Sequence, residues 1–476
     1  MKQKSKIILI IFSLIFISNT LLAQESWDWK KCIEYALKNN LQLKQTDINI
    51  QMGNSTLLQQ KLNYSPNINA ASNYDLKVGN NYDFFSNSYN KSLVHYQDYG
   101  ININQPIFDG LITPNNVKKS KLDLQALQLD QETLKNNIQL QIITAFLNIM
   151  NANEQYQQAV QQKASTEEQY ERMKVLIAAG GAAEKALLDI ETQLTSEDLT
   201  ITQIKSQSDL AYLNLKLLLQ LDVKQNITIL IPELPKDLTL APMEDINTIY
   251  MDALHIRPEI KSNQLKIQSA QKQIAVAKGS YSPTLNLLGN LNTFFTTQSK
   301  ITNTITTGDY VLSGAIVANS FEPVLIPKTI TTQSNNPYRK QLNQNLSYAL
   351  GVSLNVPIYN KFQVQTAVKQ SKLRYQAALY SAQQGEVDLF NSIQQAYIKT
   401  KTAINNYTAA VKNVETAQKS YDYAIERLNA GSINQLETNL AKTNLEVALS
   451  KLTQAKYEYL FNSKLLDFYQ GKKIEL

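Results

Sequence analysis

The chain has 476 residues, a formal net charge of +6, and only 14 glycines, two histidines and one cysteine. The charge is too small and too dispersed to indicate a nucleic-acid-binding protein. Two histidines exclude a histidine metal cluster, and one cysteine excludes a disulfide framework. Glycine lies far below its usual share of about 7%, which favours long helices.

The N-terminus has the pattern of a secretory signal peptide. Lys2, Lys4 and Lys6 precede an apolar run over residues 7–17, and Ala23 offers a small residue for cleavage. The run is shorter than the roughly 20 residues that a membrane-spanning helix needs. We therefore expect export from the cytoplasm, with the mature chain beginning after Ala23.

A helix and two strands are expected next. Apolar spacing predicts a helix over 25–61, which Pro66 ends because the residue before a proline disfavours helical geometry. From Asn67 the apolar residues alternate with polar ones, which is the period of a strand. A second strand is expected over 99–105, and the Asn-rich segment 80–90 between them is expected to be a loop.

A long helical hairpin closes the first half. It is predicted to run from Asn115 to Leu221 and to turn at Gly180-Gly181. The following segment, 223–245, contains three prolines and is predicted to be a connector.

The second half then repeats the first. Tyr64-Ser65-Pro66 aligns with Tyr281-Ser282-Pro283, and Ala36-Leu37 aligns with Ala253-Leu254 at the same spacing. One insertion between Pro283 and Pro357 keeps the later parts aligned, and it falls in a Thr-rich segment, 298–344, that we expect to be a loop. Such a duplication is typical of two structural units that complete one body.

The elements of this half follow the same order. Alternation predicts strands over 285–295 and 347–356. A helix is expected over 361–428, where residues spaced by seven indicate a coiled-coil seam. The seam is formed by 390, 397, 404, 411, 418 and 425 and by 393, 400, 407, 414, 421 and 428. The chain is predicted to turn at Ala430-Gly431 and to return as a helix over 433–470.

Four strands with one apolar face are equally typical of a soluble sheet and of a membrane barrel. The signal peptide and the long helices favour the membrane. The predicted fold class is an α+β membrane protein, internally duplicated, with four transmembrane strands per chain and long coiled-coil hairpins. The domains are a signal peptide at 1–23, a first repeat at 24–222, a connector at 223–245 and a second repeat at 246–476.

No arrangement of residues indicates catalysis. There is no phosphate-binding glycine loop and no histidine with a nearby nucleophile. We therefore predict that the chain is not an enzyme and that it binds no cofactor, no catalytic metal and no nucleic acid.

The chain resembles the TolC-type outer-membrane efflux channels. The resemblance rests on the duplicated order of elements, the Tyr-Ser-Pro helix ends and the segment from Arg427 to Ala441, in which Gly431, Glu437 and Ala441 match the family pattern. Leu428 stands where tyrosine is common, and Leu440 replaces a second acidic residue.

The resemblance implies a homotrimer that closes a twelve-stranded barrel in the lipid of the outer membrane and continues as an α-helical barrel through the periplasm. The implied partners are a periplasmic adaptor and an inner-membrane efflux pump or ABC transporter. The function would be that of a passive exit duct for efflux or type I secretion. A structural or adhesive coiled-coil protein without a pore is the alternative.

Three groups of residues are candidate sites, and each has a simpler explanation. The hairpin tips would bind the adaptor, although a glycine there also simply ends a helix. Acidic residues would form an entrance gate, although a carboxylate at a helix start is favoured by the helix dipole alone. Strand asparagines would line the barrel lumen, or only keep an edge strand soluble. The tip residues are Gly180, Gly181, Arg427, Leu428 and Gly431; the gate residues are Glu437 and Asp189; the lumen residues are Asn69, Asn102, Asn104, Asn286 and Asn290.

Overall fold

The computed structural model describes residues 26–83, 87–222, 227–230, 238, 240 and 242–472. The predicted signal peptide and most of the predicted connector lie outside these residues. The chain divides into two compact units, and both halves of the duplication contribute to each. A helical unit comprises Met1–Asn54, Leu122–Gln268 and Gln376–Leu476, and a strand-rich unit comprises Ser55–Lys121 and Ser269–Tyr375.

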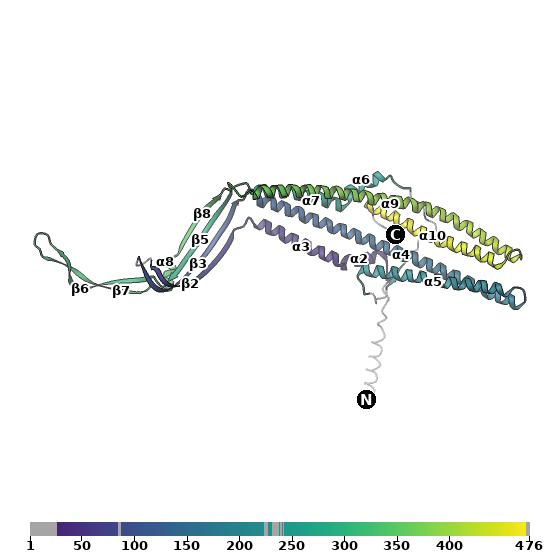
Figure 1. Ribbon diagram of the computed structural model, residues 1–476, viewed down its shortest axis with the longest axis horizontal. Helices are drawn as coiled ribbons and strands as arrows, with labels where there is room; N and C mark the ends of the chain where they lie inside the picture. Colours follow the sequence, from purple (N-terminus) through teal and green to yellow (C-terminus); the bar gives the residue numbers. More distant parts are fainter. Residues whose placement is uncertain are drawn as a thin grey trace, which may run out of the picture. The chain divides into compact units, whose positions relative to one another are not determined.

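Two helical hairpins dominate the helical unit (Figure 1). The first joins α4 (Ile112–Ala178) to α5 (Glu184–Leu219), and the second joins α9 (Gln363–Asn429) to α10 (Gln435–Tyr469). With 67 residues each, α4 and α9 extend about 100 Å at 1.5 Å per residue. Both predicted hairpins are confirmed, with ends shifted by only a few residues.

The predicted first helix is two helices. Helix α2 (Trp29–Asn39) and helix α3 (Leu41–Leu62) meet at Asn40. The Asn40 side chain accepts hydrogen bonds from the backbone N–H groups of Gln42 and Leu43, so it caps α3. The second half repeats the break between α6 (Ile246–Ile256) and α7 (Pro258–Gly279), where Pro258 occupies the first helical position.

The largest apolar core of the helical unit lies around the middle of α4. Phe146, Ile142 and Ile149 are fully buried there, against α2, α5 and α10. A short parallel pairing of β1 (Ser26–Trp27) with β4 (Thr228–Ile229) closes its edge. A second core joins α6, α9 and α10 around Ile249 and Ile393.

Of the two rows predicted to form the coiled-coil seam of α9, one is buried as predicted and the other is not. Positions 393, 400 and 407 are buried, but the other predicted row ends in the exposed Val411 and Ile425. The buried partner row lies one residue earlier, and most of its members are alanines, whose small side chains permit close helix packing. It contains Leu389, Ala396, Ala403, Ala410 and Ala424.

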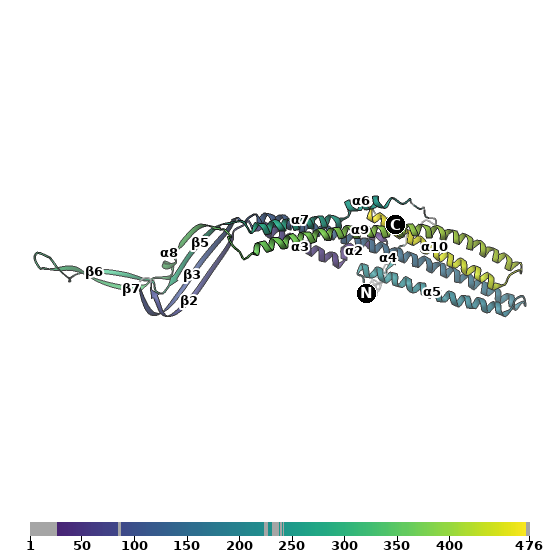
Figure 2. The ribbon, with the colours of Figure 1, turned by 45° about the horizontal axis from the view of Figure 1, so that its top comes forward.

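The strand-rich unit contains one antiparallel sheet in the order β2-β3-β5-β8 (Figures 1 and 2). Its strands are β2 (Asn67–Asp83), β3 (Ser88–Phe108), β5 (Thr284–Thr296) and β8 (Ser347–Asn355). All four predicted strands are confirmed. The expected loop at 80–90 is wrong, because β2 and β3 continue pairing to Asp83 and Ser88.

The expected loop at 298–344 is also wrong. It contains a second antiparallel pair, β6 (Lys300–Ile316) with β7 (Pro323–Asn335), and the short helix α8 (Tyr338–Gln344). Its threonines and isoleucines are β-branched and therefore suit strands, a signal that the polar composition obscured.

Candidate functional site: a two-faced sheet and two glycine-tipped hairpins

One face of the four-stranded sheet carries a row of amides. Asn69 of β2 pairs in register with Asn102 of β3, which pairs with Asn290 of β5. Asn104 lies two residues further along β3 and Asn286 four residues back along β5, so both share this face. Asp98 also lies there and accepts a 3.1 Å hydrogen bond from the side chain of Asn73. The structure therefore gathers all five predicted lumen residues on one polar face.

The opposite face is apolar and uncovered within one chain. Leu350 is 84% exposed and Tyr348 is 83% exposed, values that a soluble sheet with a buried face would not show. The two residues belong to a continuous apolar surface across all four strands. It comprises Ile68, Tyr74, Ile101, Ile103, Leu287, Leu291, Tyr348, Leu350, Val352 and Leu354.

Both edges of this sheet are open. Strand β2 pairs only with β3, and β8 pairs only with β5, within the described part of the chain. The free edge of each strand presents a row of backbone groups that need partners. Among the described residues, no helix is long and apolar enough to cross a bilayer.

The two hairpin tips share one backbone geometry. Gly180 has a φ of 71° and Gly431 a φ of 68°, the left-handed region that favours glycine. At each tip the next residue donates a 2.9 Å backbone hydrogen bond five positions back, from Gly181 to Leu176 and from Ser432 to Arg427. This pattern is the Schellman helix end. Gly180, rather than Gly181, is therefore the counterpart of Gly431.

Space at both tips is open. A Cβ atom at Gly180 or at Gly431 would meet nothing within 4 Å. Arg427 is exposed and Leu428 is half-buried at the end of α9. The predicted docking residues therefore lie at two accessible turns, one at the tip of each hairpin.

The predicted gate residues begin the two return helices. Asn434 caps α10 by accepting a 2.9 Å hydrogen bond from the Glu437 backbone, and the Glu437 side chain is exposed. Asp189 lies in the second turn of α5 and is half-buried. The two acidic residues therefore belong to different hairpins, Asp189 to α5 and Glu437 to α10.

The sequence analysis missed a buried polar cluster between α4, α5 and α10. Lys442 of α10 is only 3% exposed, and its ammonium donates a 2.6 Å hydrogen bond to the Thr166 hydroxyl. That hydroxyl donates in turn to the Glu197 carboxylate at 2.7 Å, and the Gln193 amide donates to the same oxygen at 3.0 Å. The sequence carried one signal for this cluster. Lys442 lies four residues after Thr438 and three before Leu445, which places it on the same buried side of α10.

A cavity of about 110 Å³ adjoins this cluster, lined by residues of α4, α5 and α10 that include Gln162, Glu197 and Glu446. One carboxylate oxygen of Glu197 and one of Glu446 are buried without a hydrogen-bond partner. Burial lowers the pKa of Lys442 and raises the pKa of Glu446, because both charged forms lose hydration.

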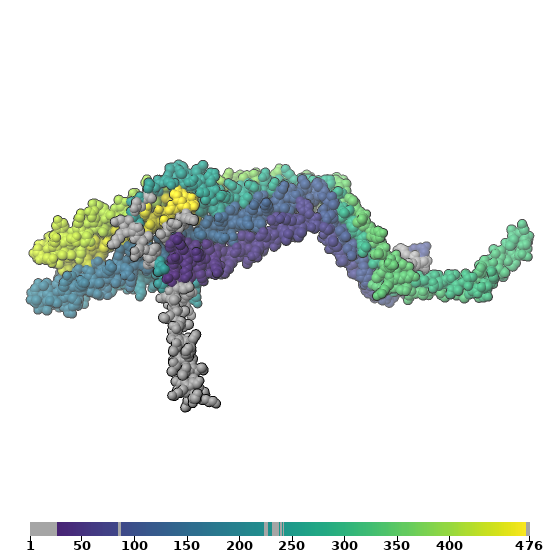
Figure 3. Space-filling view, turned by 180° about the vertical axis from the view of Figure 1, so that it is seen from behind, coloured from purple at the N-terminus to yellow at the C-terminus, as the bar shows by residue number. Residues whose placement is uncertain are grey.

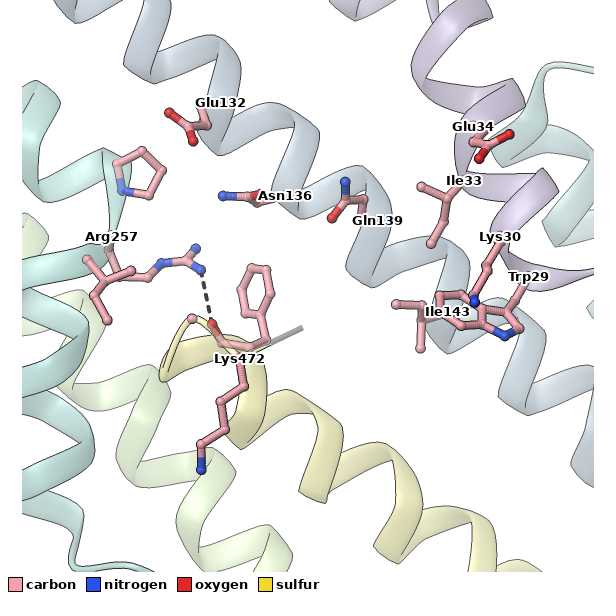
Figure 4. Close-up of a pocket in the computed structure, with 14 residues that line it drawn as sticks. Trp29, Lys30, Ile33, Glu34, Glu132, Asn136, Gln139, Ile143, Arg257 and Lys472 are labelled. Carbon is pink, nitrogen blue, oxygen red and sulfur yellow. Dashed lines mark hydrogen bonds between the residues drawn. The ribbon is translucent and has the colours of Figure 1, made fainter. Parts of the chain in front are cut away.

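A cavity of about 580 Å³ lies between α2, α4 and the end of α10 (Figure 4). Figure 4 shows Glu132, Asn136 and Gln139 of α4 along one wall. The Arg257 guanidinium donates to Glu259 at 2.8 Å and to the Phe468 carbonyl at 3.5 Å, and it lies 4.1 Å from the Phe468 ring. Arg257 therefore fastens the start of α7 to the end of α10.

Within the described ranges, no group of three or more histidine, cysteine, aspartate or glutamate side chains is placed to hold an ion. Cys32 is fully buried, and burial raises the pKa of its thiol to about 12, so this cysteine stays an unreactive thiol.

The fold and its surfaces define a class of protein, the outer-membrane channels with a helical extension. The family model described as "Outer membrane efflux protein" matches residues 32–219 and 249–472, and the chain belongs to this family. The predicted resemblance is confirmed. Membership of an efflux family also supports the prediction that the chain is not an enzyme.

Individual relatives are distant. The alkaline protease secretion protein AprF of Pseudomonas aeruginosa is 23% identical over 138 residues, which cover 29% of this chain and 28% of that protein. The Campylobacter jejuni CmeC outer membrane channel superposes with a TM-score of 0.72 at 18% identity, covering 93% of this chain and 85% of that one. The outer membrane protein VceC of Vibrio cholerae superposes with a TM-score of 0.74 at 14% identity, covering 94% of this chain and 97% of that one.

Proposed function

We propose that three copies of this chain form a passive exit duct through the outer membrane. The observation that carries this proposal is the four-stranded sheet with an amide face, an exposed apolar face and two open edges. Four strands are too few to close a barrel, because small closed barrels have about eight. Three copies joined edge to edge would supply twelve strands, with the amides lining a wet lumen and the apolar face in lipid.

The helical hairpins would continue this duct as an α-helical barrel through the periplasm. Their length of about 100 Å exceeds what a single globular core requires. Under this proposal the polypeptide consists of a signal peptide (1–23), two repeats (24–222 and 246–476) and the connector (223–245). A pore-less adhesive coiled coil would have no use for the exposed apolar sheet face.

The partners would be a periplasmic adaptor at the tips and an inner-membrane efflux pump or ABC transporter. The name of the relative AprF refers to protease secretion, and that of the matching family refers to efflux. Both processes need the same exit duct, so either type of pump is consistent with this chain.

The entrance would be lined by acidic side chains at the start of the return helices. Threefold symmetry would bring three copies of Glu437 near one axis, with Asp189 of the neighbouring hairpin as a second contributor. Leu440, exposed one turn after Glu437, stands where a second acidic residue of α10 would complete a doubled ring, so α10 contributes one carboxylate per chain at these two positions. Three carboxylates at one entrance would attract cations, and salt would screen the effect over about 8 Å.

We predict that Gly431→Val abolishes export while leaving the amount of assembled protein unchanged. A β-branched residue at a positive φ costs on the order of 1–2 kcal/mol, enough to distort the tip and too little to unfold the long helices. Export assays and the amount of native assembly in the outer membrane measure these two quantities, and crosslinking to the adaptor measures docking at the tip.

Gly431→Asn is the matched control, because asparagine tolerates the left-handed region far better. It should retain more export and adaptor crosslinking than the valine variant. Full export by Gly431→Val would show that this tip is not the docking point.

A further inference from the structure

The pair β6–β7, residues 300–335, forms an arm whose strands pair only with each other within the described part of the chain. The space-filling view shows this arm projecting beyond the four-stranded sheet (Figure 3). Its apolar side chains are largely exposed, with Leu312 at 67% and Tyr310 at 66%. An isolated two-stranded hairpin is at best marginally stable in water, so an arm of this length needs contacts from outside the chain.

The arm is apolar on both of its faces. On one face Val311 pairs with Ile326, and four residues along β7 the pair Ile305–Ile330 lies on the same side. The other face carries Leu312 paired with Leu325 and Tyr310 paired with Pro327. The two surfaces differ in composition, with valine and isoleucine on one face and leucine, tyrosine and proline on the other.

The base of the arm is fixed to the sheet. Asn336 donates a 3.1 Å hydrogen bond to the Ser299 hydroxyl, and the Gln341 amide donates to the Asn336 carbonyl at 2.8 Å. Gln341 also accepts a 3.0 Å bond from the backbone of Thr296 in β5, and all four side chains are buried. These hydrogen bonds hold the base of the arm in a defined position at the end of β5.

We propose that the arms of three copies pack against one another, one face of each arm on the opposite face of the next. The inference rests on the threefold assembly proposed above and extends it beyond the barrel. In a threefold ring every arm has two neighbours, which accounts for two apolar faces, whereas a single foreign partner would cover one. Because the faces differ, the contact is head-to-tail. The threefold assembly of the sheet would close this contact after three copies.

Two further features favour a second copy over lipid. Each strand of the arm has one unpaired edge, and unpaired backbone groups are costly in hydrocarbon. The arm carries two lysines, Lys300 and Lys328, and two acids, Asp309 and Glu322, so neighbouring copies do not repel each other by net charge. The packed arms would form a cap at the mouth of the duct.

Paired cysteines on opposite faces test this arrangement. The double variant Leu312→Cys/Ile326→Cys places one thiol on each face of the arm, where the two cannot join within one chain. Cys32 is buried, so the introduced thiols are the accessible ones. Mild oxidation of intact cells should give covalent dimers and trimers, at least tenfold above the level from either single variant.

Native mass of the detergent-solubilised protein is measured in parallel. Trimers without arm crosslinks would overturn the packing of the arms and leave the proposed duct standing. A single variant that crosslinks as well as the double would overturn the head-to-tail contact. A crosslink to a different protein in place of chain dimers would assign the arm to a foreign partner. Absence of trimers would contradict the proposed duct itself.

Discussion

Replacing Leu350 with arginine should prevent assembly in the outer membrane, whereas the same replacement at the adjacent Ala349 should be tolerated. The two residues are neighbours on β8 and lie on opposite faces of the sheet. An arginine facing lipid costs about 2–4 kcal/mol near the bilayer midplane, and a threefold assembly would incur this cost three times. At position 349 the guanidinium would enter the polar face beside Asn290.

The measurement is the amount of native, heat-modifiable assembly in outer-membrane fractions of the two variants. Equal and normal levels would show that the face with Leu350 is not in lipid. If both variants lose the assembly equally, β8 tolerates arginine on neither face. That result would contradict the assignment of one face to lipid and the other to the lumen.

Replacing Lys442 with methionine should destabilise the helical unit by about 3 kcal/mol per chain, because it removes the cation from a buried carboxylate. Methionine keeps much of the volume of lysine, but it cannot donate to the Thr166 hydroxyl that in turn donates to Glu197. The change leaves the Glu197 carboxylate buried without a compensating charge, and this destabilises the folded state.

Lys419→Met is the matched control. Lys419 forms an exposed ion pair with Glu415 at 2.9 Å on α9, and solvent screens such pairs so that they contribute little to stability. In thermal unfolding of the two purified variants in detergent, the midpoint temperature should fall clearly for Lys442→Met and hardly at all for Lys419→Met. Similar midpoints for both would mean that the buried cluster does not hold the helices together.

Much of the fold could be predicted because its signals are local. Alternation of period two located β2, β5 and β8, since each strand has one polar and one apolar face. Glycine in a long helical pattern located both tips, because few other residues adopt the positive φ of Gly180 and Gly431. The duplication then related the tip of one hairpin to that of the other.

Other features depend on contacts that one sequence does not reveal. One row of the α9 seam lies one residue earlier than predicted. Its members include Ala396 and Ala403, which are buried although alanine is a weak signal of a buried position in a sequence. The break at Asn40 depends on a capping side chain within a continuous helical pattern. The polar composition of 298–344 hid the arm, and the cluster at Lys442 joins residues from three distant helices.

Closure of the sheet between neighbouring chains is the central claim, and disulfide formation across the β2–β8 seam tests it most directly. Ala349→Cys on β8 is combined in turn with Asn69→Cys, Ala71→Cys or Asn73→Cys on β2, all on the amide face. Three positions are needed because the register between copies follows from barrel shear. At one of them, oxidation in the outer membrane should convert the chain into a covalent trimer that migrates as one band. Monomers at all three positions, or a ladder that continues beyond three chains, would contradict a closed barrel of three copies.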